Sequence, residues 1–256
     1  MKEKKAAIVL GIIVVSVIVT VLALSFFQKD RDRRNMAERI FSMGNPMSEA
    51  RSRGTTPETI EGLKAAISLY ENRIEKFLSD VEKTGTYWKI LAIRLHDRGF
   101  HAEALEALER AIYYTPADPV LHYYTGISAG VVAKSFHNFP GRNVSDRDRY
   151  FALAEQAFLR SIELDSNYAR PRYGLGVLYT FELERPNDAI PHLEICLAIL
   201  RNDVDSMFVL ARAYYMTRQF KGALDLYDRI IMLTRDEGRR NEAQNNRQTV
   251  MEQMHG

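Results

Sequence analysis

Side chains that could catalyse a reaction or bind a metal ion occur in this sequence without the spacing that either task requires. None of the six histidines is paired as in the zinc-binding pattern H-E-x-x-H. These histidines are His96, His101, His122, His137, His192 and His255. The single cysteine, Cys196, excludes an internal disulfide framework and a cysteine-based metal site. We expect Cys196 to be a small buried residue.

Phosphate-binding and nucleophile motifs are also missing from the sequence. The segment Tyr173-Gly174-Leu175-Gly176 lacks the third glycine of a dinucleotide-binding loop, so its glycines are interpreted as helix-packing positions. No G-x-x-x-x-G-K-[ST] loop and no G-x-S-x-G turn is present. The prediction is a protein that is not an enzyme, with no catalytic residue, no metal site and no cofactor.

Aromatic and basic side chains recur at positions from which they could bind another protein. In four segments they are spaced i, i+4 and i+7, which places them on one face of a helix. Aromatic rings give a large contact area at low entropic cost, and arginine pairs with carboxylates or stacks on rings. The candidate binding residues are Lys89, Ile93, Tyr123, Tyr124, Arg170, Tyr173, Val177, Phe208, Arg212 and Tyr215. The alternative is that the aromatic rings pack internally or against a nearby insertion.

The helices that must carry these residues are indicated by a repeated pattern of small and large residues. The pattern starts at Ala104, Ala154, Ala189 and Ala223, which are 50, 35 and 34 residues apart. A large apolar residue follows four positions later, at Leu108, Phe158, Leu193 and Tyr227. A third residue on the same face follows at Ala111, Ser161, Cys196 and Ile230. The preceding helices have their own small residues, at Ala92, Gly126, Gly176 and Ala211. Small residues allow neighbouring helices to approach, and the large residues fill the space beside them.

This pattern resembles the tetratricopeptide repeat (TPR) family, whose unit is a helix–turn–helix of about 34 residues. The match is strongest at Trp88, Leu91, Ala92, Gly99, Ala104, Leu108, Ala111 and Pro116. Departures occur at His122, Thr125 and Arg172, where bulkier apolar residues are usual, and at Ser166 and Arg201 in place of the closing proline. The resemblance implies an all-α fold, a TPR-type α-solenoid of antiparallel helix pairs.

The predicted boundaries follow from the four aligned units. They are an N-terminal helix or half-repeat at 56–84, repeats at 85–118, 119–168, 169–203 and 204–235, and a C-terminal capping helix and tail at 236–256. Thr84-Gly85-Thr86 is expected to break the first helix. The second repeat contains an insertion at about 134–148, which includes Pro140 and Gly141 and is expected to be a loop that leaves the repeat.

The N-terminal segment predicts a membrane anchor. Residues 1–5 are a short basic tail, and the 22 residues from Ala6 to Phe27 carry no charge. A helix of that length spans about 33 Å, close to the thickness of a bilayer core. The alternative is a cleaved signal peptide, with Ala23-Leu24-Ser25 as the cleavage site. Residues 28–55 are expected to form a flexible basic tether.

The resemblance also implies how the protein works, because the concave face of such an array holds a partner's peptide or helix. The clamp for chaperone C-terminal carboxylates is not supported, since Lys89 is followed one turn later by Ile93. The expected function is a membrane-tethered scaffold that binds an unknown protein in this groove. The alternative is a structural subunit of a membrane or envelope assembly that acts by self-association or stacking.

Composition and charge limit the other partners of the chain. The net charge of +2 demands no nucleic acid, and no small-molecule substrate is expected. The expected location is an inner or plasma membrane crossed once, with the C-terminal domain on the outer side.

Overall fold

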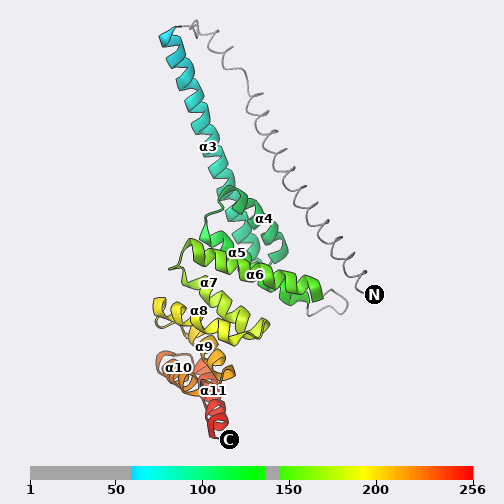
Figure 1. Ribbon diagram of the computed structural model, residues 1–256, viewed down its shortest axis with the longest axis vertical. Coiled ribbons are helices and arrows are strands. Elements are labelled where there is room, and N and C mark those ends of the chain that lie inside the picture. The colour runs from blue at the N-terminus through cyan, green and yellow to red at the C-terminus, as the bar shows by residue number, and fades with distance from the viewer. Residues whose placement is uncertain (1–58, 137–143, 256) are drawn as a thin grey trace, which may run out of the picture. The chain divides into compact units, whose positions relative to one another are not determined.

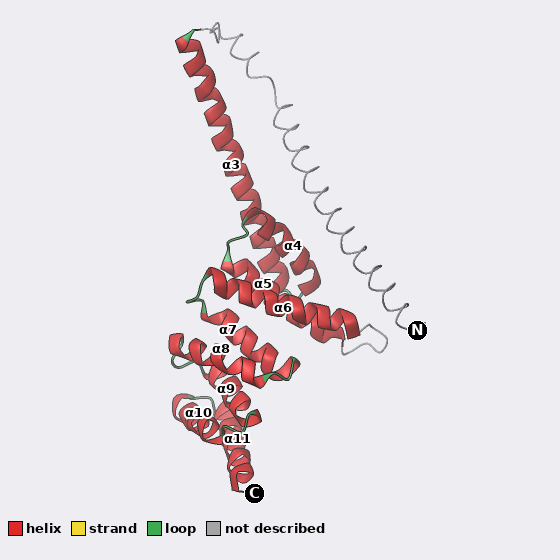
Figure 2. Cartoon of the chain, in the orientation of Figure 1, coloured by secondary structure: helices red, strands yellow, loops and turns green. Residues whose placement is uncertain are grey.

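The computed structural model describes residues 59–136 and 144–255, and these residues are helical apart from the short connections between helices. The elements are α3 (Ile60–Asp97), α4 (His101–Tyr114), α5 (Pro119–Ser135), α6 (Val144–Leu164), α7 (Ala169–Val177), the π-helical turn η2 (Leu178–Glu182), α8 (Pro186–Ile199), α9 (Val204–Met216), α10 (Phe220–Leu233) and α11 (Glu237–His255) (Figure 1). Within the described residues no strand occurs, which confirms the all-α prediction for this part of the chain (Figure 2).

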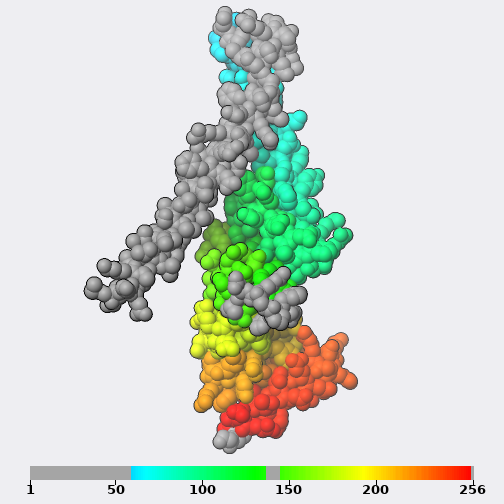
Figure 3. Space-filling view, turned by 90° about the vertical axis from the view of Figure 1, so that its right-hand side faces the viewer, coloured from blue at the N-terminus to red at the C-terminus, as the bar shows by residue number. Residues whose placement is uncertain are grey.

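The chain divides into two compact units, residues 1–78 and residues 79–256, and each is described by itself. The described part of the first unit is the beginning of α3. In the second unit each helix from α4 to α11 packs on the next one along the chain, and α5, α7 and α9 also contact one another in succession. Figure 3 shows this order from green at α5 to red at α11. Helix pairs that stack on their neighbours form a solenoid.

The packing positions inferred from the repeat are buried as expected. Ala104, Ala154, Ala189 and Ala223 have no exposed surface, and the large residues four positions later are buried beside them. The third position of the pattern is buried in all four repeats as well, and at Cys196 this confirms a small buried residue. The glycine interpretation is also confirmed, because a β-carbon on Gly176 would lie 2.3 Å from Leu193 Cδ2. The small and large positions of the repeat therefore pack as the pattern predicts.

The first helix differs from the sequence prediction, because α3 continues through Thr84-Gly85-Thr86 instead of breaking there. The Thr84 hydroxyl donates to the Asp80 carbonyl at 2.7 Å, and the Thr86 hydroxyl donates to the Glu82 carbonyl at 3.0 Å. Such bonds to the preceding turn keep the threonine side chains compatible with a helix. Gly85 is buried, and a β-carbon there would lie 2.8 Å from Tyr114 Cβ. Gly85 thus permits close packing of α4, and it does not end the helix.

The insertion in the second repeat is also partly helical, contrary to the predicted loop. Helix α5 extends to Ser135 and α6 begins at Val144, so both ends of the 134–148 insertion belong to helices. Residues 137–143 lie outside the described residues. The extra residues therefore lengthen the second helix pair at one end.

Two of the turns between paired helices share one backbone geometry. After α3, the Phe100 N–H donates to the Leu95 carbonyl and the Gly99 N–H donates to the His96 carbonyl, both at 2.9 Å. Gly99 has φ of 81°, as this Schellman turn requires at its left-handed position.

The turn after α9 has the same hydrogen bonds. The Gln219 N–H donates to the Tyr214 carbonyl and the Arg218 N–H donates to the Tyr215 carbonyl, and Arg218 has φ of 60°. Arginine thus occupies a position that favours glycine.

The first helix of the third repeat contains a π-helical turn, η2, in which the Leu183 N–H donates to the Leu178 carbonyl at 3.0 Å. A π turn holds one residue more than an α turn. The sequence shows where that residue comes from, because 13 positions separate Gly176 from Ala189, whereas 12 separate Ala211 from Ala223. The third repeat is therefore one residue longer, and η2 accommodates the difference inside the helix.

The chain ends in α11, on which Ala243 and Val250 are buried against the last repeat. At the other end, the predicted basic tail, transmembrane helix and tether at 1–55 lie outside the described residues. Within residues 59–136 and 144–255, no helix combines the length and the apolar character needed to cross a bilayer.

Candidate functional site

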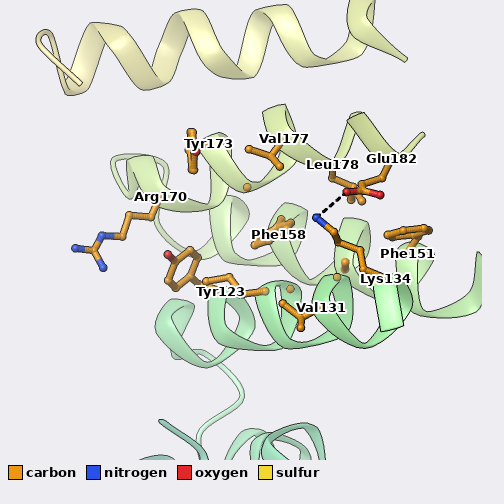
Figure 4. A pocket seen from close by; sticks show the side chains of 15 residues that line it. Tyr123, Val131, Lys134, Phe151, Phe158, Arg170, Tyr173, Val177, Leu178 and Glu182 are labelled. Atoms are coloured by element: carbon orange, nitrogen blue, oxygen red, sulfur yellow. Dashed lines mark ion pairs between the residues drawn. The ribbon is translucent and has the colours of Figure 1, made fainter. Parts of the chain in front are cut away.

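A half-open cavity of about 290 Å³ lies among α5, α6 and α7 with η2 (Figure 4). Its lining is mostly apolar, with one charged residue at one end and an ion pair at the other. The residues are Tyr123, Gly126, Ile127, Gly130, Val131, Lys134, Phe151, Ala154, Phe158, Arg170, Tyr173, Gly174, Val177, Leu178 and Glu182. We call this space the α5–α7 cavity.

The floor of the α5–α7 cavity is the ring of Phe158, which α6 inserts between two glycines. A β-carbon on Gly126 or on Gly174 would lie 2.5 Å or 2.6 Å from this ring, so both helices must present glycine to it. Gly130 is different, because a β-carbon there would meet no atom within 4 Å. Gly130 thus leaves empty space that a side chain from outside the chain could fill.

One end of the cavity is aromatic. The rings of Tyr123 and Tyr168 meet edge to face with their centroids 5.3 Å apart. Burial raises the pKa of Tyr123, and the nearby Arg170 guanidinium opposes that rise. Burial likewise raises the pKa of Tyr173. Both phenols are therefore neutral hydrogen-bonding groups at physiological pH. Arg170 is exposed, and Figure 4 shows its guanidinium pointing away from the cavity.

The other end of the cavity carries an ion pair between two repeats. Lys134, near the end of α5, lies with its Nζ 3.1 Å from Glu182 Oε1 at the end of η2 (Figure 4). The Glu182 side chain is largely buried, whereas that of Lys134 is exposed. An exposed ion pair contributes little to stability, about 0–1 kcal/mol. Its main effect here is to place a polar rim beside an apolar space.

Four of the ten predicted binding residues meet in the α5–α7 cavity: Tyr123, Arg170, Tyr173 and Val177. Lys89 and Ile93 instead line a separate hollow of about 340 Å³. There the Lys89 ammonium lies 2.5 Å from Asp118 Oδ2, while Asp118 Oδ1 accepts from the Val120 N–H at the start of α5. Lys89 therefore has a partner within its own repeat.

The remaining four predicted residues lie outside both spaces. Tyr124 packs on the core formed by α3, α4 and α5, with its ring 5.0 Å from that of His96. Phe208 packs against Tyr227 and Tyr215 against Phe220, with centroids 6.2 Å and 6.1 Å apart. Arg212 is exposed and lies over the Tyr215 ring. These side chains are thus not gathered with those of the cavity.

The structure adds site residues that the sequence prediction omitted. Lys134 was detectable, because it continues the helical face of Tyr123, Ile127 and Gly130 by one turn. Phe158 was predicted to pack between helices, and its ring also forms the cavity floor. Glu182 had no sequence signal, since only η2 brings it to this end. For the same reason Thr180, which fits the pattern of the face, is buried outside the cavity.

Residues that could hold a metal ion are not gathered in the part of the chain that the structure describes. No cluster of three or more histidine, cysteine, aspartate or glutamate side chains occurs within residues 59–136 and 144–255. His96 and His101 are neighbours, with ring centroids 4.9 Å apart, but the His96 Nδ1 lies 3.0 Å from the Ser128 hydroxyl. This pair is therefore part of the packing between the first two repeats.

Comparison with known proteins gives structural similarity without sequence similarity. No family model matches the chain, and no curated protein matches its sequence. Among solved structures, the chain is similar to YrrB, described as a TPR protein with an unusual peptide-binding site. The identity is 16%, the TM-score is 0.56, and 71% of this chain and 83% of YrrB are covered.

Two further solved structures agree with this similarity. TTC0263, described as a thermophilic TPR protein in Thermus thermophilus, is 17% identical with a TM-score of 0.52 over 79% of this chain and 97% of that one. The ArsTM double mutant of MamA RS-1 is 18% identical with a TM-score of 0.52 over 66% and 93%. At such identities the similarity establishes the fold alone. The described chain therefore has the fold of TPR proteins, a solenoid of paired helices.

Proposed function

We propose that this protein is a membrane-tethered scaffold whose α5–α7 cavity takes a large apolar side chain from a peptide or helix of a partner protein. The observation that carries the proposal is the unfilled apolar space above Phe158 and beside Gly130, in a cavity with two neutral tyrosines at one end (Figure 4). Buried apolar anchors that enter such pockets supply most of the affinity of many protein interfaces.

The size of the cavity favours a side chain over a whole small molecule. Pockets for drug-sized ligands or cofactors enclose roughly 300–1,000 Å³ and surround most of the ligand. The α5–α7 cavity, at about 290 Å³ and half open, is at the lower limit of that range. It suits a single anchor whose main chain stays outside. The similarity to YrrB, described as having a peptide-binding site, also supports a peptide ligand.

The charges at the two ends suggest the residues that flank this anchor. Arg170 is exposed at the aromatic end, so an acidic residue of the partner next to the anchor would gain a charge-assisted hydrogen bond. Lys134 already has an acidic partner in Glu182. We therefore expect the acidic residue to lie on the Arg170 side of the anchor.

The tether belongs to the proposal as well. The uncharged run from Ala6 to Phe27 supports a single N-terminal membrane helix, with the solenoid on the outer side of an inner or plasma membrane. Protein purified from membranes should retain this run at its N-terminus. A soluble form that begins at Phe26 would show instead that the segment is a cleaved signal peptide.

Filling the cavity from within tests the binding site directly. Gly130→Leu places a side chain into the empty space and also improves helix propensity, so the fold should survive. A random peptide library displayed on phage is selected on the wild-type protein, and the enriched peptides are tested on the variant. We expect peptides with one large apolar residue, whose affinity falls at least about thirtyfold in Gly130→Leu, as for loss of an interface anchor.

The control variant is Glu106→Leu, which adds the same side chain to an exposed position of α4. It should leave both binding and melting temperature unchanged. Peptides that bind wild type and Gly130→Leu equally well, with both proteins folded, would show that the cavity is not the site.

A further inference from the structure

The beginning of α3 carries a row of large apolar side chains that nothing in the described structure covers. Ile60, Leu63, Ile67, Tyr70 and Ile74 are between 43% and 68% exposed. They lie within the first unit of the chain, on the segment drawn in cyan in Figure 1. We call these five residues, with the half-buried Phe77, the α3 stripe. Contiguous exposed apolar rows of this kind mark interaction sites.

The spacing of the α3 stripe identifies the kind of partner. From Ile60 to Phe77 the intervals alternate between three and four residues without exception. This is a seven-residue repeat with apolar residues at its a and d positions, the pattern of two helices that supercoil around each other. Isoleucine occupies the a position at 60, 67 and 74. The α3 stripe therefore fits another helix with the same repeat.

We propose that the α3 stripe pairs with the α3 stripe of a second copy of this chain, in the antiparallel direction, with Ile67 of each copy packed against Tyr70 of the other. This register places Ile60 opposite Phe77 and Leu63 opposite Ile74 of the second copy. Every layer of the contact then contains residues from the stripe, and the pair has two-fold symmetry. The site is separate from the α5–α7 cavity, so neither proposal depends on the other.

Side-chain volume favours the antiparallel direction over the parallel one. In a parallel pair, Tyr70 would face Tyr70 and Phe77 would face Phe77, while isoleucine would face isoleucine in the layers between. The layers would then alternate between crowded and sparse, although helix interfaces pack at uniform density. In the antiparallel pair, each aromatic ring faces an isoleucine instead. The three different layers, each of which occurs twice by symmetry, therefore have similar volumes.

Charge selects the register. Lys64 and Glu71 flank the stripe on the same side, at the e positions of consecutive repeats, and both are exposed. In an antiparallel pair e positions face one another. The proposed register sets Lys64 opposite Glu71 of the second copy, and symmetry makes this contact twice. On the other flank, Arg73 faces Ala66 of the second copy, so no like charges meet there.

The neighbouring registers are disfavoured by the same two residues. A shift by one repeat in one direction sets Lys64 opposite Lys64 of the second copy. A shift in the other direction sets Glu71 opposite Glu71. Like charges in these positions repel, which is how paired helices exclude wrong registers. The charge pattern thus supports one register and opposes the two alternatives.

Disulfide trapping of the full chain tests the pairing and its direction. The double variant Ile60→Cys, Phe77→Cys should form an oxidised dimer. In the proposed register the cysteine at position 60 of each copy faces the cysteine at position 77 of the other copy. Within one helix these positions are about 25 Å apart at about 1.5 Å per residue, too far for an internal bond. Neither single variant should form a dimer. The native Cys196 is buried and stays in place in all samples.

Three outcomes of the trapping experiment would overturn the proposal. A dimer from Ile60→Cys alone would mean a parallel pair. No dimer from the double variant would mean that the α3 stripe is covered by something other than a second copy. A dimer formed equally by Asn72→Cys, an exposed position off the stripe, would mean random collision.

Charge reversal provides an independent test of the register, with trapping yield measured over a dilution series of the double-cysteine chain. Lys64→Glu and Glu71→Lys should each weaken dimerisation roughly tenfold, since two ion pairs are replaced by two repulsive contacts. Combining both reversals restores opposite charges and should restore dimerisation to within about twofold. The control Lys76→Glu reverses an exposed charge away from the stripe and should have little effect. Failure of the combined variant to recover would exclude this register.

Discussion

The ring of Phe158 lies so close to Gly126 that a β-carbon on this glycine would stand 2.5 Å from the ring. Gly130, one turn further along α5, has no atom within 4 Å of the corresponding point. The two glycines therefore serve different purposes on one helix. Gly126 allows the first and second helices of the repeat to meet over a phenylalanine, whereas Gly130 leaves a space open.

The two glycines should respond oppositely to alanine. Gly126→Ala is expected to lower the free energy of unfolding by up to about 2 kcal/mol, because overpacking costs about 1–3 kcal/mol and the better helix propensity of alanine offsets about 1 kcal/mol of that cost. Gly130→Ala should raise it by about 0.5–1 kcal/mol, since alanine has the lower conformational entropy to lose. Urea unfolding of both variants measures the difference. If both variants changed the free energy of unfolding in the same direction, the ring of Phe158 would be free to move away from Gly126.

The turn after α9 should be improved by glycine. Arg218 has φ of 60°, at the position that Gly99 occupies in the turn after α3. A residue with a β-carbon pays roughly 1 kcal/mol in this left-handed region, so Arg218→Gly should stabilise the protein by up to about 1 kcal/mol. Gly99→Ala should destabilise it by a similar amount. Thermal melting followed by circular dichroism gives both values, and a loss of stability in Arg218→Gly would contradict the argument.

The buried threonine of η2 should be replaceable by valine. Thr180 is 2% exposed, and its hydroxyl has no hydrogen-bond partner among the described residues. An unpaired buried hydroxyl costs about 1–3 kcal/mol, so Thr180→Val should raise the free energy of unfolding by about 1 kcal/mol. Thr125 is the matched control, because its hydroxyl donates to the Leu121 carbonyl at 2.9 Å. Thr125→Val should bring no gain in the same unfolding experiment.

Stability should fall in mildly acidic solution because of two histidines. Burial and the charge of His101 lower the pKa of His96 from 6.5, and burial and Arg172 lower the pKa of His192. The unfolded chain therefore binds protons more readily than the folded chain. The stability that the two neutral histidines contribute is present above a pH of about 6.5 and is lost as the pH falls below it.

Urea unfolding at a pH of about 7.5 and about 5.5 checks the histidine prediction. The wild-type protein should be less stable at the lower pH. The variant His96→Gln, His192→Gln removes both groups and should show a smaller difference between the two conditions. An equal pH dependence in the wild type and in this variant would assign the effect to other residues.

The repeat register was predictable because it depends on volume. Alanine at 104, 154, 189 and 223 and glycine at 126 and 176 sit where helix axes approach, and no larger residue fits there. The break at Thr84-Gly85-Thr86 was predicted wrongly for the same reason. Glycine weakens an isolated helix by about 1 kcal/mol, but here it also lets Tyr114 approach, and this tertiary gain is invisible in the local sequence.

The site was only partly predictable because helical periodicity places a side chain on a face without saying what covers that face. Tyr123 and Tyr173 were assigned to one face, and both line the α5–α7 cavity. Phe208 fits the same pattern and lies against Tyr227 as Tyr123 lies against Phe158, yet Phe208 does not line the cavity. Whether a space stays open on the inner face depends on the size of the side chains around it, and in the α5–α7 cavity Gly130 is a lining residue whose β-carbon position meets no atom within 4 Å.

The extra residue of η2 has a consequence for how such a groove can change in evolution. One added residue turns all the side chains after it by about 100° around the helix axis while the ends of the helix stay in place. In the third repeat Glu182, the last residue of η2, lies beside Lys134, and Thr180 within η2 is buried. The insertion of a single codon could therefore add a charged group to the edge of a binding surface while leaving the packing of every repeat unchanged.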